Sequence, residues 1–153
     1  MRKSLPIALI PITVCGWLLM TAAVRAELTF ESAGRSTIGF VRDSGMVESA
    51  NRATVGFIAV NGVVEDAAHR TMGYLREHGV VENAGHATVG FFRRRGETIV
   101  LENAHHGAIG AVNDGGTIED SRHATYGFVR GPVRGNERLI VAYLFFFAPS
   151  PMQ

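Results

Sequence analysis

The chain has 153 residues, of which 46% are hydrophobic, 19% are charged and 18 are glycine, and its formal net charge is +1. This length accommodates one domain, and the hydrophobic fraction excludes a disordered or collagen-like chain. The near-neutral charge gives no electrostatic basis for a nucleic-acid partner, so we expect none.

The first 26 residues are predicted to be a signal peptide. Arg2 and Lys3 form a positive start, an almost wholly apolar stretch covers residues 5–24, and small residues lead up to Ala26. This order predicts export, with cleavage after Ala26 as the first choice and cleavage after Ala23 as the second.

Two alternatives for this segment are weaker. The apolar stretch approaches the roughly 20 residues that span a membrane, but Pro6, Pro11 and the cleavage-like end favour a signal peptide. Lipoprotein processing at Cys15 would need a small residue where Val14 stands. Cleavage after Ala26 removes the only cysteine, so the exported chain has no disulfide. We therefore expect a periplasmic, outer-surface or secreted protein, with an envelope or extracellular partner and no transmembrane span in the mature chain.

Residues 27–131 consist of a 17-residue repeat. Each copy has two apolar residues and a glutamate, a polar turn, then Thr–apolar–Gly–aromatic–apolar and a glycine turn. A three-residue insertion at 97–99 interrupts the register, which is marked by Gly39, Gly56, Gly73, Gly90, Gly110 and Gly127. β-Branched and aromatic residues predict short strands, and Asn61–Gly62 predicts a tight hairpin turn. The repeat predicts an all-β domain: a closed, pseudo-symmetric array of short hairpins or, alternatively, a β-solenoid.

The recurring glycine predicts a crowded position. Glycine and the aromatic residue that follows it point to opposite faces of a strand, and glycine is favoured in a strand where another backbone approaches closely. We expect the aromatic positions, where Ala111 is the exception, and the apolar positions before the glycines to form the main hydrophobic layer. These residues are Phe40, Phe57, Tyr74, Phe91 and Phe128, with Ile38, Val55, Met72, Val89 and Ile109.

Five complete hairpins lie between Gly39 and Glu119, and a strand remains at each end, near residues 28–32 and 125–130. Pairing of these two strands would close a ring and remove its exposed edges, which leaves a count of five or six blades open.

The sequence from residue 28 to residue 147 resembles the five-fold β-flower proteins, which are small exported bacterial proteins. The resemblance lies in its Thr-Ile-Gly-Phe, Ser-Gly and Val-Glu elements and in its Phe-rich tail. The resemblance implies the fold and brings no catalytic residues.

Residues 132–153 are predicted to be a separate C-terminal segment. Gly131 and Pro132 end the repeat, and residues 139–148 are ten consecutive apolar residues, too few for a transmembrane helix. We predict a strand over 139–148 that packs against the aromatic layer or fills the ring. The alternative is an exposed surface for a membrane or a partner.

One repeat position is always glutamate, and the position four residues later is always arginine or histidine. The glutamates are Glu31, Glu48, Glu65, Glu82, Glu102 and Glu119, and the bases are Arg35, Arg52, His69, His86, His106 and His123. A symmetric ring of these groups facing a central site could hold a metal ion or a small anion. The favoured interpretation is local pairing of each glutamate across its turn, because arginine cannot ligate a metal and the neighbours His105 and His106 point to opposite faces. We assign no metal site and no cofactor.

The sequence contains no Ser–His–Asp order, no cleft of paired carboxylates and no phosphate-binding glycine loop. The basic run at residues 93–95 is interpreted as a solvated hairpin tip. We therefore predict a non-enzymatic envelope protein with a structural or interaction role. The alternative is a ligand-binding module that uses Glu48, Glu65, Glu82, Glu102, Glu119, His69, His86, His106 and His123 for a metal ion or a small anion.

Overall fold

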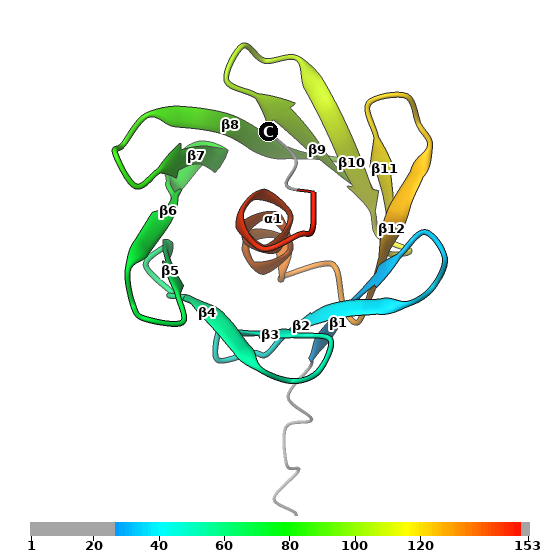
Figure 1. Ribbon diagram of the computed structural model, residues 1–153. Helices are drawn as coiled ribbons and strands as arrows, with labels where there is room; N and C mark the ends of the chain where they lie inside the picture. Colours follow the sequence, from blue (N-terminus) through cyan, green and yellow to red (C-terminus); the bar gives the residue numbers. More distant parts are fainter. Residues whose placement is uncertain (1–26, 151–153) are drawn as a thin grey trace, which may run out of the picture.

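The computed structural model describes residues 27–150, which form a closed antiparallel barrel around one helix (Figure 1). The predicted signal peptide lies outside the described residues. The strands are β1 (Leu28–Ser32), β2 (Thr37–Val41), β3 (Met46–Ser49), β4 (Thr54–Ile58), β5 (Val63–Asp66), β6 (Thr71–Leu75), β7 (Val80–Asn83), β8 (Thr88–Arg95), β9 (Thr98–Asn103), β10 (Ala108–Asn113), β11 (Thr117–Asp120) and β12 (Thr125–Arg130). A 3-10 turn, η1 (Glu77–Gly79), precedes β7, and the helix α1 (Glu137–Phe146) follows β12.

The barrel closes through the two ends of the repeat domain. Strands that follow one another in the sequence are hydrogen-bonded neighbours, and β1 pairs with β12, so that Thr29 lies opposite Arg130 and Ser32 opposite Gly127. This closure confirms the hairpin array and excludes the solenoid. We call each glycine strand with its glutamate strand a blade. Within the described residues these are blade 1 (β2–β3), blade 2 (β4–β5), blade 3 (β6–β7), blade 4 (β8–β9), blade 5 (β10–β11) and blade 6 (β12–β1).

The residue before each repeat glycine lies in a β-bulge. In the β1–β2 pair, Phe30 lies opposite Gly39 and Glu31 lies opposite Thr37, so Ile38 is left between them without a direct partner. The same shift recurs in each of the other strand pairs that join one blade to the next. A bulge bends its strand and increases the local twist, which helps such short strands curve around a barrel. The bulge residues, such as Ile38, are half-buried and pack against the core, whereas the prediction placed them in its main layer.

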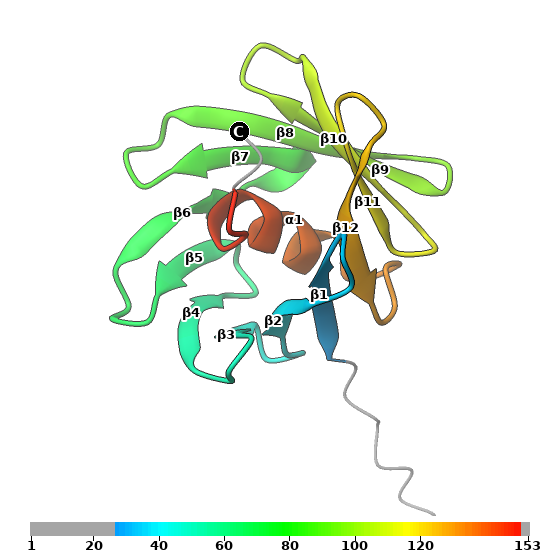
Figure 2. The ribbon, with the colours of Figure 1, turned by 45° about the vertical axis from the view of Figure 1, so that its right-hand side comes forward.

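The strand predicted over residues 139–148 is wrong, because most of this segment forms α1, which lies in the lumen of the barrel (Figure 2). The closed barrel has no edge for another strand, whereas a helix satisfies its own backbone groups in an apolar lumen. A run that is apolar throughout has no periodicity to distinguish the two. The prediction that the segment fills the ring is confirmed by the full burial of Ile140 and Val141. Within residues 27–150, no helix is long and apolar enough to cross a membrane.

The repeat glycines make room for aromatic side chains of the C-terminal segment. A Cβ atom at Gly39 would collide with the Tyr143 hydroxyl, and one at Gly73 would collide with both the Phe146 ring and the Glu82 carbonyl. Four glycine–aromatic pairs share this contact: Gly39–Tyr143, Gly56–Phe147, Gly73–Phe146 and Gly90–Phe145. The position is therefore crowded, as predicted, but by the helix as well as by the neighbouring backbone.

The aromatic residues after the glycines do not form the main core, contrary to the prediction. The core consists of α1 and the inward-facing strand residues, such as Phe30, Val41 and Leu101. Strand alternation points each glycine into the lumen and the following ring outward. Phe57, Tyr74, Phe91 and Phe128 are accordingly half-buried on the outer face, and Phe40 is buried there. In the lumen, Tyr143 stacks on Phe30 with ring centroids 3.7 Å apart, and burial raises the pKa of Tyr143 to about 12.

Candidate functional site

The repeated charged residues form a belt on the outer face of the barrel. Each glutamate lies directly across the strand pair from the aromatic position of its blade, as Glu48 lies opposite Phe40 and Glu102 opposite Phe91. The base four residues after the glutamate then covers the ring. We call each such set a trio: Glu31–Arg35–Phe128, Glu48–Arg52–Phe40, Glu65–His69–Phe57, Glu82–His86–Tyr74, Glu102–His106–Phe91, and Glu119–His123 with Ala111 in place of the ring.

Histidine trios combine ring stacking with a contact to the carboxylate. The His106 and Phe91 ring centroids are 4.1 Å apart, and His69 lies 4.6 Å from Phe57. The Nδ1 atom of His69 lies 3.0 Å from an oxygen of Glu65, and that of His106 lies 3.3 Å from an oxygen of Glu102. These histidine side chains remain about two-thirds exposed. In blades 2, 3 and 4, each imidazole thus contacts its own glutamate and stacks on its own ring.

Arginine trios place the guanidinium on the ring instead. The guanidinium carbon lies 3.4 Å from the ring centroid in both the Arg35–Phe128 and the Arg52–Phe40 pair, a cation–π contact. Arg52 also donates to Glu48 at 3.2 Å. Arginine and histidine are both flat and both donate hydrogen bonds, which explains why either occupies this position.

A second arginine neutralises four of the six glutamates. Arg42 makes a two-pronged contact with Glu48, its Nε and Nη2 each 3.0 Å from a carboxylate oxygen. This contact is the main reason that the pKa of Glu48 lies below its usual value. The equivalent pairs are Arg76–Glu82, Arg93–Glu102 and Arg130–Glu31. Blades 2 and 5 have Ala59 and Asn113 at this position.

The turn before each glycine strand explains the orientation of the bases. All six bases adopt a left-handed backbone conformation with φ between 58° and 66°. The turn begins at an Asp, Asn or Ser, and the Asp66 carboxylate accepts backbone N–H bonds from Ala68 and Arg70 at 2.9 and 3.0 Å. These bonds close a tight turn. The base at the end of the turn, such as His69, therefore lies over the glutamate and the ring of its own trio.

The structure supports local pairing of the repeat residues rather than a shared central site. Glu48, Glu65, Glu82, Glu102, Glu119, His69, His86, His106 and His123 all lie in these separate trios on the outer face. The centre of the ring is occupied by α1 (Figure 1). Among residues 27–150, no cluster of three or more His, Cys, Asp or Glu side chains is arranged to hold a metal ion. His105 lies in an exposed turn, where its backbone N–H donates to Asn103.

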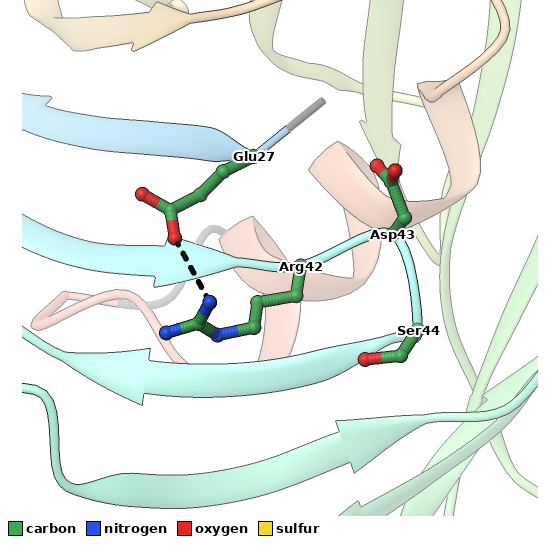
Figure 3. Close-up of a pocket in the computed structure, with 4 residues that line it drawn as sticks. All are labelled: Glu27, Arg42, Asp43 and Ser44. Atoms are coloured by element: carbon green, nitrogen blue, oxygen red, sulfur yellow. Dashed lines mark ion pairs between the residues drawn. The ribbon is translucent and has the colours of Figure 1, made fainter. Parts of the chain in front are cut away.

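A small hollow lies beside the start of β1, and Figure 3 shows the four residues that line it. Glu27, Arg42, Asp43 and Ser44 line it, and its volume is about 120 Å³. Glu27 is already paired there, with Arg42 at 3.7 Å and with Arg52 at 2.7 Å, while the Asp43 carboxylate points away from the pair. Ligand pockets usually measure about 300 Å³ or more, so this hollow suits water molecules better than an organic ligand.

Sequence reasoning missed the ionic tether that holds α1 in place. Arg94 donates to Glu137 at 2.8 Å and to Asp114 at 2.6 Å, and Asp114 also pairs with Arg134. Arg93 pairs with Glu102, so two residues of the basic run at 93–95 are neutralised rather than freely solvated. The tether joins residues 43 positions apart, and the sequence carried no signal for it beyond the charges themselves.

Comparisons with known proteins identify the family. Neither the curated proteins nor the solved structures include a match to this chain. A family model described as the 5-fold beta-flower protein matches residues 27–147, which includes all twelve strands and α1. The described residues of this chain carry six blades, the sixth made from its two ends. Its repeat, its closed ring of hairpins and this match together show that the chain belongs to the five-fold β-flower protein family.

Proposed function

We propose that this protein is an exported, non-enzymatic β-flower module that has a structural or interaction role in the bacterial envelope. The observation that carries the proposal is the division of the barrel into a filled lumen and a charged outer belt. Side chains from α1 fill the lumen, with Tyr143 and Phe145 almost fully buried. A partner would therefore be met on the outer face or at the ends of the barrel.

The charge arrangement of the belt favours a scaffold over an enzyme. Catalytic acids and bases are usually held in a cleft with pKa values tuned toward the working pH. Here the shifts run the other way: Arg42 lowers the pKa of Glu48, and Arg76 lowers that of Glu82, which keeps both carboxylates ionised. Such pairs stabilise a surface, and their repetition around the ring indicates a structural purpose.

Export is supported by the first 26 residues and by the position at which the fold begins. The apolar stretch and Ala26 have the order of a secretory signal. Cleavage after Ala26 would keep Glu27, which pairs with Arg52 at 2.7 Å, and every strand from β1 onward. The mature chain would then contain the complete barrel.

The proposal is tested by expressing residues 1–153 in a bacterial host, separating the cell fractions and measuring the intact mass. We expect a chain that starts at Glu27 in the periplasm, on the surface or in the medium, and Ala26→Tyr should block this processing. A start at Val24 would move the cleavage site without changing the proposal. An unprocessed chain in the cytoplasm would contradict export, and turnover of any compound in a panel of ester, glycoside and peptide substrates would contradict the non-enzymatic role.

A further inference from the structure

Blade 5 lacks the aromatic ring that the other five trios share and, like blade 2, the second arginine that pairs with the glutamate. Ala111 stands where the other blades carry Phe or Tyr, and Asn113 stands where Arg93 pairs with Glu102 in blade 4. The cross-strand row Val100–Ala111–Glu119 corresponds to Val80–Phe91–Glu102 of the preceding blade. Blade 5 thus keeps the valine and the glutamate of this row, while the aromatic ring and the arginine that would pair with the glutamate are missing.

The missing parts leave their neighbours exposed. The Glu119 side chain is 35% exposed, against 5% for Glu102, and His123 is 87% exposed, against 65% for His106. Glu119 keeps one contact of its trio, to His123 Nδ1 at 3.4 Å. Its side chain is the most exposed of the six trio glutamates, followed at 31% by Glu65, whose blade also lacks the second arginine.

A hollow of about 340 Å³ occupies this place on the outer face. Its lining includes the apolar side chains of Val100, Ala108 and Ala111 and the polar side chains of Glu119, Asp120 and His123. The apolar part of the lining suits an aromatic ring, and the Glu119 carboxylate suits a positive charge. Asp120 adds negative charge, although its Oδ1 already accepts the backbone N–H groups of Arg122 and Ala124. The volume falls in the range of small-molecule sites.

We propose that this hollow binds a small arylalkylammonium compound, which is a planar aromatic ring carrying a positively charged amine on a short chain. The ring would stack on His123 as Phe91 stacks on His106, and the amine would pair with Glu119 as Arg93 pairs with Glu102. One ligand thereby supplies both parts that blade 5 lacks. The site is a property of the folded blade, so it goes beyond the proposed function and does not depend on export.

The test uses purified residues 27–153 and the probe 2-phenylethylammonium, followed by ligand-observed and amide NMR titration. We expect millimolar binding, with the largest amide shifts in blade 5, at Ala111, Glu119 and His123. Phenylacetate tests the charge and should bind at least about fivefold more weakly. 2-Cyclohexylethylammonium tests the ring and should lose about three- to tenfold, the usual range for an aromatic stacking contact.

Three variants separate the site from non-specific binding. Ala111→Phe fills the hollow with the ring that the other blades carry, so it should abolish probe binding while the protein stays folded. Asn113→Arg supplies the missing cation and should weaken the probe several-fold. Glu119→Gln should remove the preference for 2-phenylethylammonium over phenylacetate.

Several results would overturn the proposal. They are equal binding of the two oppositely charged probes, unchanged binding by a folded Ala111→Phe variant, amide shifts spread over the other blades, and no binding at 2-phenylethylammonium concentrations of tens of millimolar. Should Ala111→Phe not fold, the Glu119→Gln variant decides the question, because it removes the charge and keeps the size of the side chain. Asn113→Arg is a weaker fallback, since it also removes the hydrogen bond that Asn113 Oδ1 accepts from the Thr117 backbone N–H at 3.0 Å.

Discussion

The two faces of the barrel wall use the same repeat in different ways. On the inner face, all six blades carry glycine at one position, although the groups that it meets differ from blade to blade, from Tyr143 at Gly39 to Phe146 at Gly73. On the outer face, the base is arginine in some trios and histidine in others, and one trio has no ring at all. The glycine on the inner face is therefore the same in all six blades, whereas the base and the ring on the outer face vary.

This difference follows from what each face contacts. The inner face packs on one shared helix, so a larger side chain at the glycine position of blades 1 to 4 would collide with a ring of the C-terminal segment. Each outer trio is a local unit in which a glutamate contacts the base four residues later. A change in one trio is therefore confined to its own blade and the adjacent one. The outer face is free to diverge, and blade 5 shows one such divergence.

The strongest test of this difference between the two faces is to add one carbon atom to the inner face. Gly73→Ala places a Cβ against the Glu82 carbonyl and the Phe146 ring. We expect the free energy of unfolding, measured with urea, to fall by at least about 3 kcal/mol, the upper part of the usual range for overpacking a core.

Gly85→Ala is the matched control for this substitution. The nearest atom to its added Cβ is the Asn83 Oδ1, at an ordinary contact distance of 3.5 Å. Here the change in stability should stay below about 1 kcal/mol, as for other glycine substitutions that the backbone tolerates. Equal effects at the two positions would show that the helix does not restrict the inner face.

Acid titration probes the outer face. The pKa values of Glu48, Asp66 and Glu82 are lowered in the folded protein, chiefly by hydrogen bonds from arginines. The folded state therefore binds fewer protons than the unfolded state near these pKa values. The stabilisation is present above the usual carboxyl range and is lost as the pH falls through about 5 to 3.

Arg42→Gln should flatten this pH dependence, because Arg42 is the main cause of the shift at Glu48. We expect the variant to be less stable than the wild type at pH 7 and the two stability curves to converge at the acid end. The control is Arg95→Gln, since Arg95 has no ion pair with the described carboxylates. Parallel curves for Arg42→Gln and the wild type would mean that Glu48 does not contribute through this pair.

Much of this architecture could be predicted from the repeat alone. The register of the glycines indicated the strands, the hairpin turns and the crowded position, and the ends of the repeat indicated how the ring closes. The face of the aromatic residues was predicted wrongly, because alternation defines two faces without saying which one is inside. That choice depends on α1, whose unbroken apolar run from Leu139 carries no periodicity.

The pairing of each glutamate with the base four residues later could be predicted from the sequence, whereas the hollow in blade 5 could not. The spacing between Glu65 and His69 indicated local pairing across a turn, which the structure shows. Ala111 was visible in the sequence as an exception among aromatic residues. Its meaning required the cross-strand row, because only the fold places Val100, Ala111 and Glu119 side by side on the outer face.

The smallest expected effect compares two histidines that differ in whether they stack on an aromatic ring. His106 and His123 have nearly the same left-handed φ, 61° and 62°, and each contacts a glutamate, but only His106 stacks on a ring. Glycine at either position relieves the same backbone strain and removes the same type of carboxylate contact. His106→Gly should therefore cost about 1 kcal/mol more in free energy of unfolding than His123→Gly, the value of an aromatic stack.

The Ala111→Phe background turns this difference into a closed test. With a ring restored in blade 5, removal of His123 should become as costly as removal of His106, which a double-mutant cycle measures as a coupling energy of about 1 kcal/mol between positions 111 and 123. A coupling energy of zero would mean that the base and the ring of a trio lie side by side without stabilising each other. In that case His123 would not be expected to stack on the ring of an aromatic ligand in blade 5 either. The double-mutant cycle therefore tests both the stability of the belt and the site proposed on it.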